Sequence, residues 1–191
     1  VVTSDVSTIT FRCPIPCTTA FQPTVEITET VPEPILLNYQ NNLIHQITKN
    51  RNNTPKSVFK QTFVLPVFEV RTNVNPVKIG NYKNTEKNLL SGALKSDALV
   101  PSSDKAVKEL CDKIIGKEKN AWNKAKRIYE YLCDNCMIEA KVRNGDSNPL
   151  DLIKKGSGDA YDFAVIYTAL LRAAEIPAYT DGGVLVNQDL Q

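Results

Sequence analysis

Residues 156–183 decide how this chain folds, and they read Gly-Ser-Gly-Asp-Ala-Tyr-Asp-Phe-Ala-Val-Ile-Tyr-Thr-Ala-Leu-Leu-Arg-Ala-Ala-Glu-Ile-Pro-Ala-Tyr-Thr-Asp-Gly-Gly. After the glycine turn, Asp159 is a good N-cap, because its carboxylate can accept hydrogen bonds from the free amides of the first helical turn. From Ala160 to Ala174 the sequence is nearly all apolar. A helix that is apolar around most of its circumference is normally buried inside a domain. Pro177 ends it, since proline disfavours helical backbone in the residue before it. The sequence therefore predicts a buried helix, followed by the start of a β-sheet at Ala178–Thr180 and Val184–Val186.

The N-terminus of this helix is the first candidate for chemistry. The positive end of a helix dipole stabilises an anion, including a thiolate, so a cysteine as the first helical residue would be an activated nucleophile. In this chain the position holds Ala160, whose methyl group cannot do that chemistry. Asp159 and Asp162 could pass for a catalytic carboxylate pair, but across a helix start they fit the cap and the dipole. Asp159 and Tyr161 flank position 160 and are the candidates for lining a cleft.

Two segments resemble the core motif of the transglutaminase-like superfamily. They are Gly158–Ala164, Gly-Asp-Ala-Tyr-Asp-Phe-Ala, and Leu170–Ala178, Leu-Leu-Arg-Ala-Ala-Glu-Ile-Pro-Ala. The family pattern has Gly-x-Cys-x-x-x-Ala, then Leu-Leu-Arg-Ala-x-Gly-Ile-Pro-Ala-Arg. This sequence departs from it with Ala160 for Cys, Glu175 for Gly and Tyr179 for Arg. The resemblance covers about half of the chain, and the combination of motifs is more specific than each short piece.

The resemblance implies a papain-like fold with a Cys-His-Asp triad, position 160 as the nucleophile position, and no cofactor or metal. Family members transfer or hydrolyse acyl groups at amide bonds, so a peptide or protein substrate is expected, with a cell-wall peptide as one candidate. The family's histidine and aspartate follow on later strands, and this sequence has no histidine after Ala160. Its only histidine, His45, lies in a segment where the family has no catalytic residue. The chain as written is therefore expected to be inactive.

Three interpretations of Ala160 stay open. The alanine replaces the cysteine of an altered or incomplete enzyme, or the chain is a natural pseudoenzyme that binds a protein or peptide, or it is a structural module whose cleft has no role. An end at Gln191 would leave a strand edge and the buried helix partly uncovered, which favours the altered or incomplete enzyme. The pseudoenzyme interpretation predicts that the gene itself encodes alanine at this position.

The composition is that of an ordinary globular protein, with 42% hydrophobic residues and a net charge of +2. The lysines are scattered and no run of basic and aromatic residues occurs, so we expect no nucleic-acid partner. No apolar stretch reaches the roughly 20 residues that a membrane span needs. The chain begins at Val1 and its only methionine is Met137, so we expect that a leader was removed or that the natural start lies upstream. With the β-rich first half, this favours a secreted or cell-envelope location.

The five cysteines are an odd number, so at least one cannot pair within the chain. Cys13 and Cys17 could form a disulfide or stay as two free thiols, and their spacing leaves both open. Cys133 and Cys136 are spaced like half of a zinc site, but zinc would need two further ligands, so we expect no metal. Cys111 lies on the apolar face of a predicted helix and is expected to be a core residue.

The pattern along the chain predicts an α+β protein. Residues 1–85 carry short strand signals between proline- and asparagine-rich turns, which predicts a β-rich, sandwich-like domain. Residues 86–101 form a connector, and residues 102–191 form the helical front half and first strands of the transglutaminase-like core. In that core, apolar periodicity predicts a helix over Asp104–Ile115, capped by Ser102 or Ser103, and another helix after Asn120.

Two further side chains of the core invite a functional interpretation. Arg172 could bind substrate, but it lies about 18 Å from Ala160 by helix rise, so we expect a structural ion pair. Trp122 could stack on a substrate, yet its place in the apolar series of its helix predicts a core residue.

Overall fold

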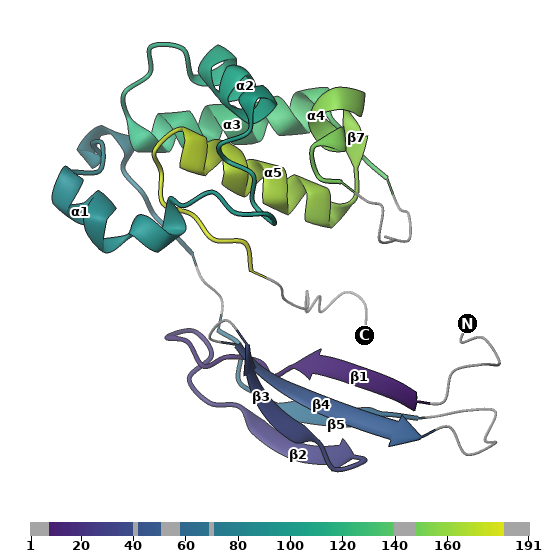
Figure 1. Cartoon of the computed structure of the whole chain (residues 1–191). Coiled ribbons are helices and arrows are strands. Elements are labelled where there is room, and N and C mark those ends of the chain that lie inside the picture. Colours follow the sequence, from purple (N-terminus) through teal and green to yellow (C-terminus); the bar gives the residue numbers. More distant parts are fainter. Residues whose placement is uncertain (1–7, 40–41, 51–57, 69–70, 140–147, 182–191) are drawn as a thin grey trace. The chain divides into compact units, whose positions relative to one another are not determined.

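The structure is a computed structural model of the chain, and it describes residues 8–39, 42–50, 58–68, 71–139 and 148–181. The chain divides into two compact units, unit 1 (Val1–Asn73) and unit 2 (Val74–Gln191). Unit 1 is built of strands and unit 2 mainly of helices, so the predicted α+β class is confirmed (Figure 1). The division lies ahead of residue 85, where the sequence analysis ends the first domain, and residues 74–101 therefore belong to unit 2.

Unit 1 contains two small antiparallel sheets. The first has the strand order β1-β4-β3 and the second pairs β2 with β5. Their bounds are β1 Thr8–Pro14, β2 Glu26–Val31, β3 Ile35–Tyr39, β4 Asn42–Asn50 and β5 Lys60–Val64. The register of β2 against β5 shifts between Ile27 and Glu29. This irregularity falls where Glu29 interrupts the alternation of apolar residues along β2, as expected for a bulge.

Two side-chain contacts join the sheets of unit 1. The rings of Phe11 and Phe59 stack with their centroids 5.2 Å apart. His45 of β4 is buried, and its Nδ1 lies 2.6 Å from Nε2 of Gln61 on β5. His45 is thus buried in a contact between strands, as expected for a structural histidine. The sandwich-like packing of the two sheets remains a prediction.

Unit 2 is organised around α5 (Ala160–Ala173), which packs against α2, α3 and α4 (Figure 1). Most of the buried residues of α5 are apolar, among them Val165, Ile166, Ala169 and Leu170. The predicted buried helix is therefore present with the predicted start. The remaining elements are η1 Pro76–Lys78, α1 Asn84–Leu89, η2 Ser91–Ala93, α2 Lys105–Ile115, α3 Ala121–Asn135, β6 Met137–Ile138, α4 Asp151–Lys155 and β7 Ser157–Gly158.

The end of the described chain differs from the prediction. Residues 178–180, expected to begin a sheet, are not in a strand. The expected strand Val184–Val186 lies outside the described residues. Among the residues that the structure describes, no helix combines the length and apolar character needed to cross a membrane.

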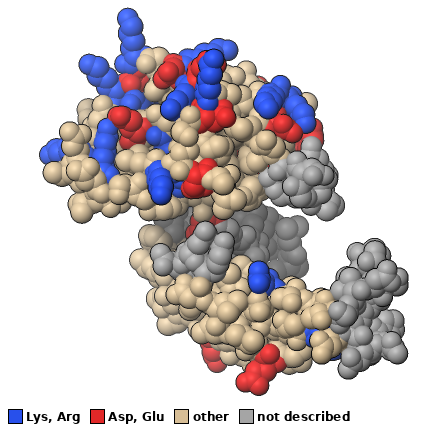
Figure 2. All heavy atoms as spheres, viewed as in Figure 1, with Lys and Arg blue, Asp and Glu red and all other residues tan. Residues whose placement is uncertain are grey.

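Charges on unit 2 are mixed in sign. Figure 2 shows its lysines and arginines spread over the visible face with aspartates and glutamates among them. Several form ion pairs one helical turn apart, as between Lys105 and Glu109 or between Lys126 and Glu130. This distribution is typical of a solvated helical surface.

Candidate active site at the start of helix α5

The N-terminus of α5 is fixed by reciprocal hydrogen bonds between two carboxylates and two backbone amides. The N–H of Asp162 donates to Oδ1 of Asp159 at 2.9 Å, and the N–H of Asp159 donates to Oδ2 of Asp162 at 3.1 Å. This is a capping box, in which each side chain satisfies an amide that the helix cannot. Asp162 is only 5% exposed. Both aspartates therefore serve the cap, as the sequence predicts.

Gly158 stands just before the cap because no side chain fits there. A Cβ atom built on Gly158 would lie 2.9 Å from both Cβ and Oδ2 of Asp162, closer than real Cβ contacts come. The glycine thus lets the chain approach the first turn of α5 closely. That approach positions residue 160 as the first residue of the helix.

Ala160 is exposed at this helix start. Tyr161 beside it is 40% exposed, and Asp159 is half-buried. The amides of a first helical turn have no partner within the helix, so they can donate to a bound group. Position 160 is therefore open to a molecule from solvent, at the positive end of a buried helix.

A short parallel strand pair borders the helix start, and the sequence analysis missed it. β6 pairs with β7 so that Met137 lies opposite Ser157 and Ile138 opposite Gly158. The N–H of Glu139 donates to the carbonyl of Gly158 at 2.8 Å, and the hydroxyl of Ser157 donates a hydrogen bond to Oε1 of Glu139. Two residues on each strand leave no periodic signal in the sequence, so only the folded chain reveals the pair.

The bordering strand adds an apolar surface to the site. Met137 and Ile138 are each 72% exposed, and Tyr161 continues the exposed apolar side chains on the first turn of α5. They are side chains that a peptide could contact next to position 160.

None of the five cysteines stands at the start of α5. All five, which fall within the described residues, are free, so Cys13 and Cys17 do not pair. Cys111 is buried and its thiol donates to the carbonyl of Leu170 at 3.5 Å. Burial raises the pKa of Cys111 to about 11, which keeps it protonated and unreactive at neutral pH. Burial also raises the pKa of Cys136.

No cluster of three or more histidine, cysteine or acidic side chains with metal-binding geometry occurs among the described residues. Cys133 and Cys136 at the end of α3 have the spacing of half a zinc site, and the absence of a metal there stays a prediction.

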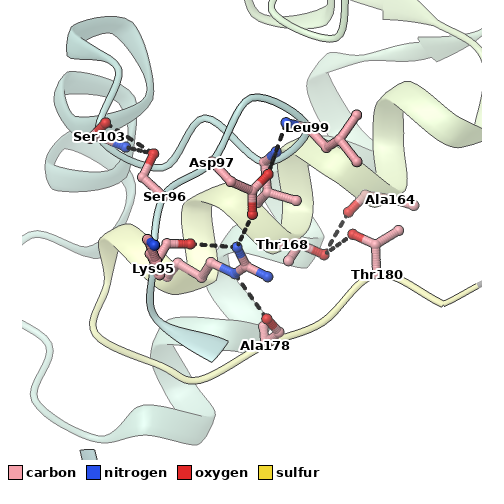
Figure 3. Close-up of polar contacts among 11 residues, drawn as sticks. Lys95, Ser96, Asp97, Leu99, Ser103, Ala164, Thr168, Ala178 and Thr180 are labelled. Carbon is pink, nitrogen blue, oxygen red and sulfur yellow. Dashed lines mark hydrogen bonds and ion pairs between the residues drawn. The ribbon is translucent and has the colours of Figure 1, made fainter. Parts of the chain in front are cut away.

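Arg172 is a structural residue at the opposite end of α5, as the sequence predicts. Its side chain is 5% exposed. Its Nε donates to the carbonyl of Ala178 at 2.9 Å, and its Nη1 donates to the carbonyl of Lys95 at 2.6 Å and to Oδ2 of Asp97 at 3.2 Å (Figure 3). The guanidinium thus joins α5 to the distant segment at Lys95 and Asp97 and to Ala178, shortly after the helix.

Trp122 is not the core residue that its place in the apolar series predicts. Its side chain is 39% exposed and lines a cavity of about 350 Å³ at the start of α3. The apolar periodicity of a helix shows which side faces the rest of the protein. It does not show that the residues packed over that side leave a cavity. Residues 159–161 do not line this cavity, so it is separate from the candidate active site.

Comparisons with known proteins agree with this organisation. A family model described as the transglutaminase-like superfamily matches residues 108–189. None of the curated proteins compared with the chain matches it.

Solved structures give two likenesses. The chain is similar to a candidate cysteine protease from Cytophaga hutchinsonii, with a TM-score of 0.64 and 18% identity over 90% of this chain and 60% of that one. It is also similar to a candidate protease from Parabacteroides distasonis, with a TM-score of 0.36 and 12% identity over 89% of this chain and 32% of that one. The chain thus spans less than two thirds of either neighbour. The first likeness shows a shared fold. Residues 108–189, somewhat less than half of the chain, thus match the model of the transglutaminase-like superfamily.

Proposed function

We propose that this chain derives from a cysteine amide hydrolase or acyltransferase that acts on peptide amide bonds, with position 160 as the nucleophile position. The observation that carries the proposal is the exposure of Ala160 as the first residue of a buried helix in a transglutaminase-like domain. A thiolate at this position would be stabilised by the helix dipole.

The reaction that this geometry supports begins with attack by the sulfur of a cysteine at 160 on an amide carbonyl carbon. The carbonyl oxygen then gains negative charge, and the backbone N–H of residue 160 is a suitable donor to it. The amide nitrogen must be protonated before it leaves, a step that the family assigns to a histidine.

The chain as written is therefore proposed to be inactive. Alanine supplies no nucleophile at 160, and the only histidine in the sequence, His45, is buried in unit 1 against Gln61. A secreted or cell-envelope location and a cell-wall peptide substrate belong to this proposal. Sequencing the mature N-terminus of the native protein tests the location.

The thiol chemistry of Ala160→Cys tests the proposal. We expect the new thiol to be alkylated by iodoacetamide faster at pH 6–7 than free cysteine, whose pKa is about 8.5, because the helix N-terminus favours the thiolate. Peptide mass spectrometry resolves the sites, with the exposed Cys17 and Cys133 as internal references. Alkylation at 160 no faster than that of free cysteine would count against an active-site role.

A second candidate function, a pseudoenzyme that binds peptides, is favoured by the exposed Met137, Ile138 and Tyr161 beside the helix start. It predicts that the unaltered chain binds a peptide and that Ile138→Ser weakens this binding. Lys154→Ser, on the exposed side of α4, is the control. If Ala160→Cys reacts at an ordinary rate while peptide binding depends on Ile138, the binding module is the better interpretation.

A further inference from the structure

The cavity at the start of α3 lies entirely within unit 2. Its walls are the loop that leads into α1, one side chain of α1, the first two turns of α3 and Ile176, three residues beyond the end of α5. Among the residues that line it are Ile79, Tyr82, Glu86, Ala121, Trp122 and Ile176. Its volume of about 350 Å³ is within the range of small-molecule sites.

The loop wall of the cavity is held in place by Asn120, the N-cap of α3. The side-chain amide of Asn120 donates to the carbonyl of Pro76 at 3.0 Å and also to the carbonyl of Ile79. Its Oδ1 accepts from the N–H of Asn123 at 3.1 Å, which caps the helix. One side chain therefore fixes both the helix start and the loop opposite it, so the cavity is preformed.

The acidic side chain of the cavity is also fixed. Oε2 of Glu86 accepts a hydrogen bond from the N–H of Lys83, the N-cap of α1, at 2.7 Å. Among the described residues that line the cavity, Glu86 is the one charged side chain. Two nearby lysines have other partners, because Lys87 pairs with Glu175 at 2.5 Å and Lys124 donates to the carbonyl of Ala174 at 3.4 Å.

The lining as a whole suits an organic cation. Tyr82 and Trp122 provide aromatic rings, which attract a cation positioned over their faces, and tryptophan does so most strongly. The carboxylate of Glu86 adds an opposite charge, and the remaining apolar lining suits alkyl groups. An anion in this space would be repelled by the Glu86 carboxylate, and a neutral ligand would lack the charge attraction that a cation gains from it.

We infer that this cavity binds an alkylammonium group, at a site separate from position 160 and independent of the function proposed above. The group is carried either by a small free cation or by a lysine side chain of a peptide, and the chemistry of recognition is the same in both.

The chain carries its own reporter for this inference, because Trp122 is its only tryptophan. We expect choline to change the Trp122 fluorescence saturably, while 3,3-dimethylbutan-1-ol, its uncharged equivalent in shape, binds at least about tenfold more weakly. An N-acetyl-lysine amide with a free or trimethylated side chain distinguishes the peptide source from the free cation. Equal responses to choline and the neutral alcohol, or no saturable response to any of the cations, would overturn the inference.

Glu86→Gln tests the role of the charge. Glutamine retains an oxygen that can accept from the N–H of Lys83, so the cap of α1 survives while the negative charge is removed. We expect the affinity for choline to fall about tenfold. Glu109→Gln, which removes an exposed glutamate of α2 paired with Lys105, is the matched control and should leave the affinity unchanged. Equal affinity in Glu86→Gln and the unaltered chain would refute the part assigned to the carboxylate.

Discussion

At the scale of single residues, Glu175 adopts a conformation that usually belongs to glycine. Its φ of 64° is in the left-handed region. The N–H of Ile176 donates to the carbonyl of Leu171 at 2.9 Å, and the N–H of Glu175 donates to the carbonyl of Arg172 at 3.0 Å. These two bonds form a Schellman motif, whose left-handed residue is commonly glycine. The family pattern has glycine here, so the departure at Glu175 costs backbone energy.

The side chain of Glu175 partly offsets that cost. Its ion pair with Lys87 lowers the pKa of Glu175, through the hydrogen bond first and the charge second. The glutamate side chain is 70% exposed, and an ion pair that solvent screens so well contributes less than about 1 kcal/mol.

Replacing Glu175 separates the two effects. Glu175→Gly removes both the left-handed strain and the ion pair, while Glu175→Ala removes the ion pair and keeps the strain. We expect the glycine variant to be more stable than the alanine variant by about 1 kcal/mol. Urea unfolding followed by the fluorescence of Trp122 measures the difference. An alanine variant as stable as the glycine variant would show that residue 175 carries no strain.

At the scale of the elements, α5 is anchored at both ends by polar groups. The capping box holds its start, and Arg172 near its end reaches the carbonyls of Lys95 and Ala178 and the carboxylate of Asp97. Tyr179 adds a ring whose centroid lies 6.0 Å from the guanidinium carbon. These contacts hold both ends of α5 in place, in addition to the apolar packing along its length.

The ion pair between Arg172 and Asp97 predicts that the stability of the folded chain depends on pH. Partial burial raises the pKa of Asp97. Hydrogen bonds from the N–H groups of Val100 and Leu99 lower it, as do the hydrogen bond and the charge of Arg172, so that the pKa is lowered overall. A carboxyl whose pKa is lower in the folded chain stabilises it fully above the unfolded pKa of about 3.9. That stabilisation is lost as the pH falls through the folded pKa.

Asp97→Asn should therefore lose less stability between about pH 5 and pH 2 than the unaltered chain does. The difference should stay below about 1 kcal/mol, because the Asp97 side chain is 49% exposed and partly screened by solvent. Urea unfolding at a series of pH values measures it, with Asp134→Asn on the exposed end of α3 as the control. Parallel acid profiles for Asp97→Asn and the unaltered chain would exclude this contribution.

The helices of unit 2 could be predicted because their signals are local. Apolar periodicity and a capping aspartate predict α5 from Ala160, and the structure begins it there. The start of α2 was placed to within one residue, but its cap is Asp104 and not a serine. Ser103 is engaged instead by Ser96, whose hydroxyl lies 2.9 Å from its own. That partner lies in the loop before the helix, outside the residues that a capping pattern takes into account.

The features that could not be predicted depend on contacts between distant segments. The order β1-β4-β3, the pairing of β6 with β7 and the cavity beside Trp122 all bring together residues far apart in the chain. The start of α5 was predictable for the opposite reason, since the glycine turn, the cap and position 160 are consecutive in sequence.

At the scale of the whole molecule, the two units differ in how much they bury. Among the described side chains, the buried ones of unit 1 are His45 and Ile47, while those of unit 2 form a continuous core around α5. Unit 1 also leaves large apolar side chains exposed, such as Ile35 at 61% and Leu36 at 58% on β3. A fully buried aliphatic side chain contributes about 1.5–3 kcal/mol to the free energy of unfolding. Apolar burial therefore stabilises the sheets of unit 1 much less than the core of unit 2.

Amide hydrogen exchange should reveal this difference within one chain. We expect peptides from β4 to exchange faster than peptides from α5, because opening the sheet exposes little apolar surface, whereas freeing α5 disrupts the core of unit 2. Mass spectrometry of the exchanging chain measures both peptides in one sample, so temperature, pH and concentration are matched. The thiol of Cys111 is buried against Leu170, so its rate of alkylation is an independent measure of how often unit 2 opens. If β4 were protected as long as α5, a contact that covers the exposed apolar strands of unit 1 would have to supply the missing stability.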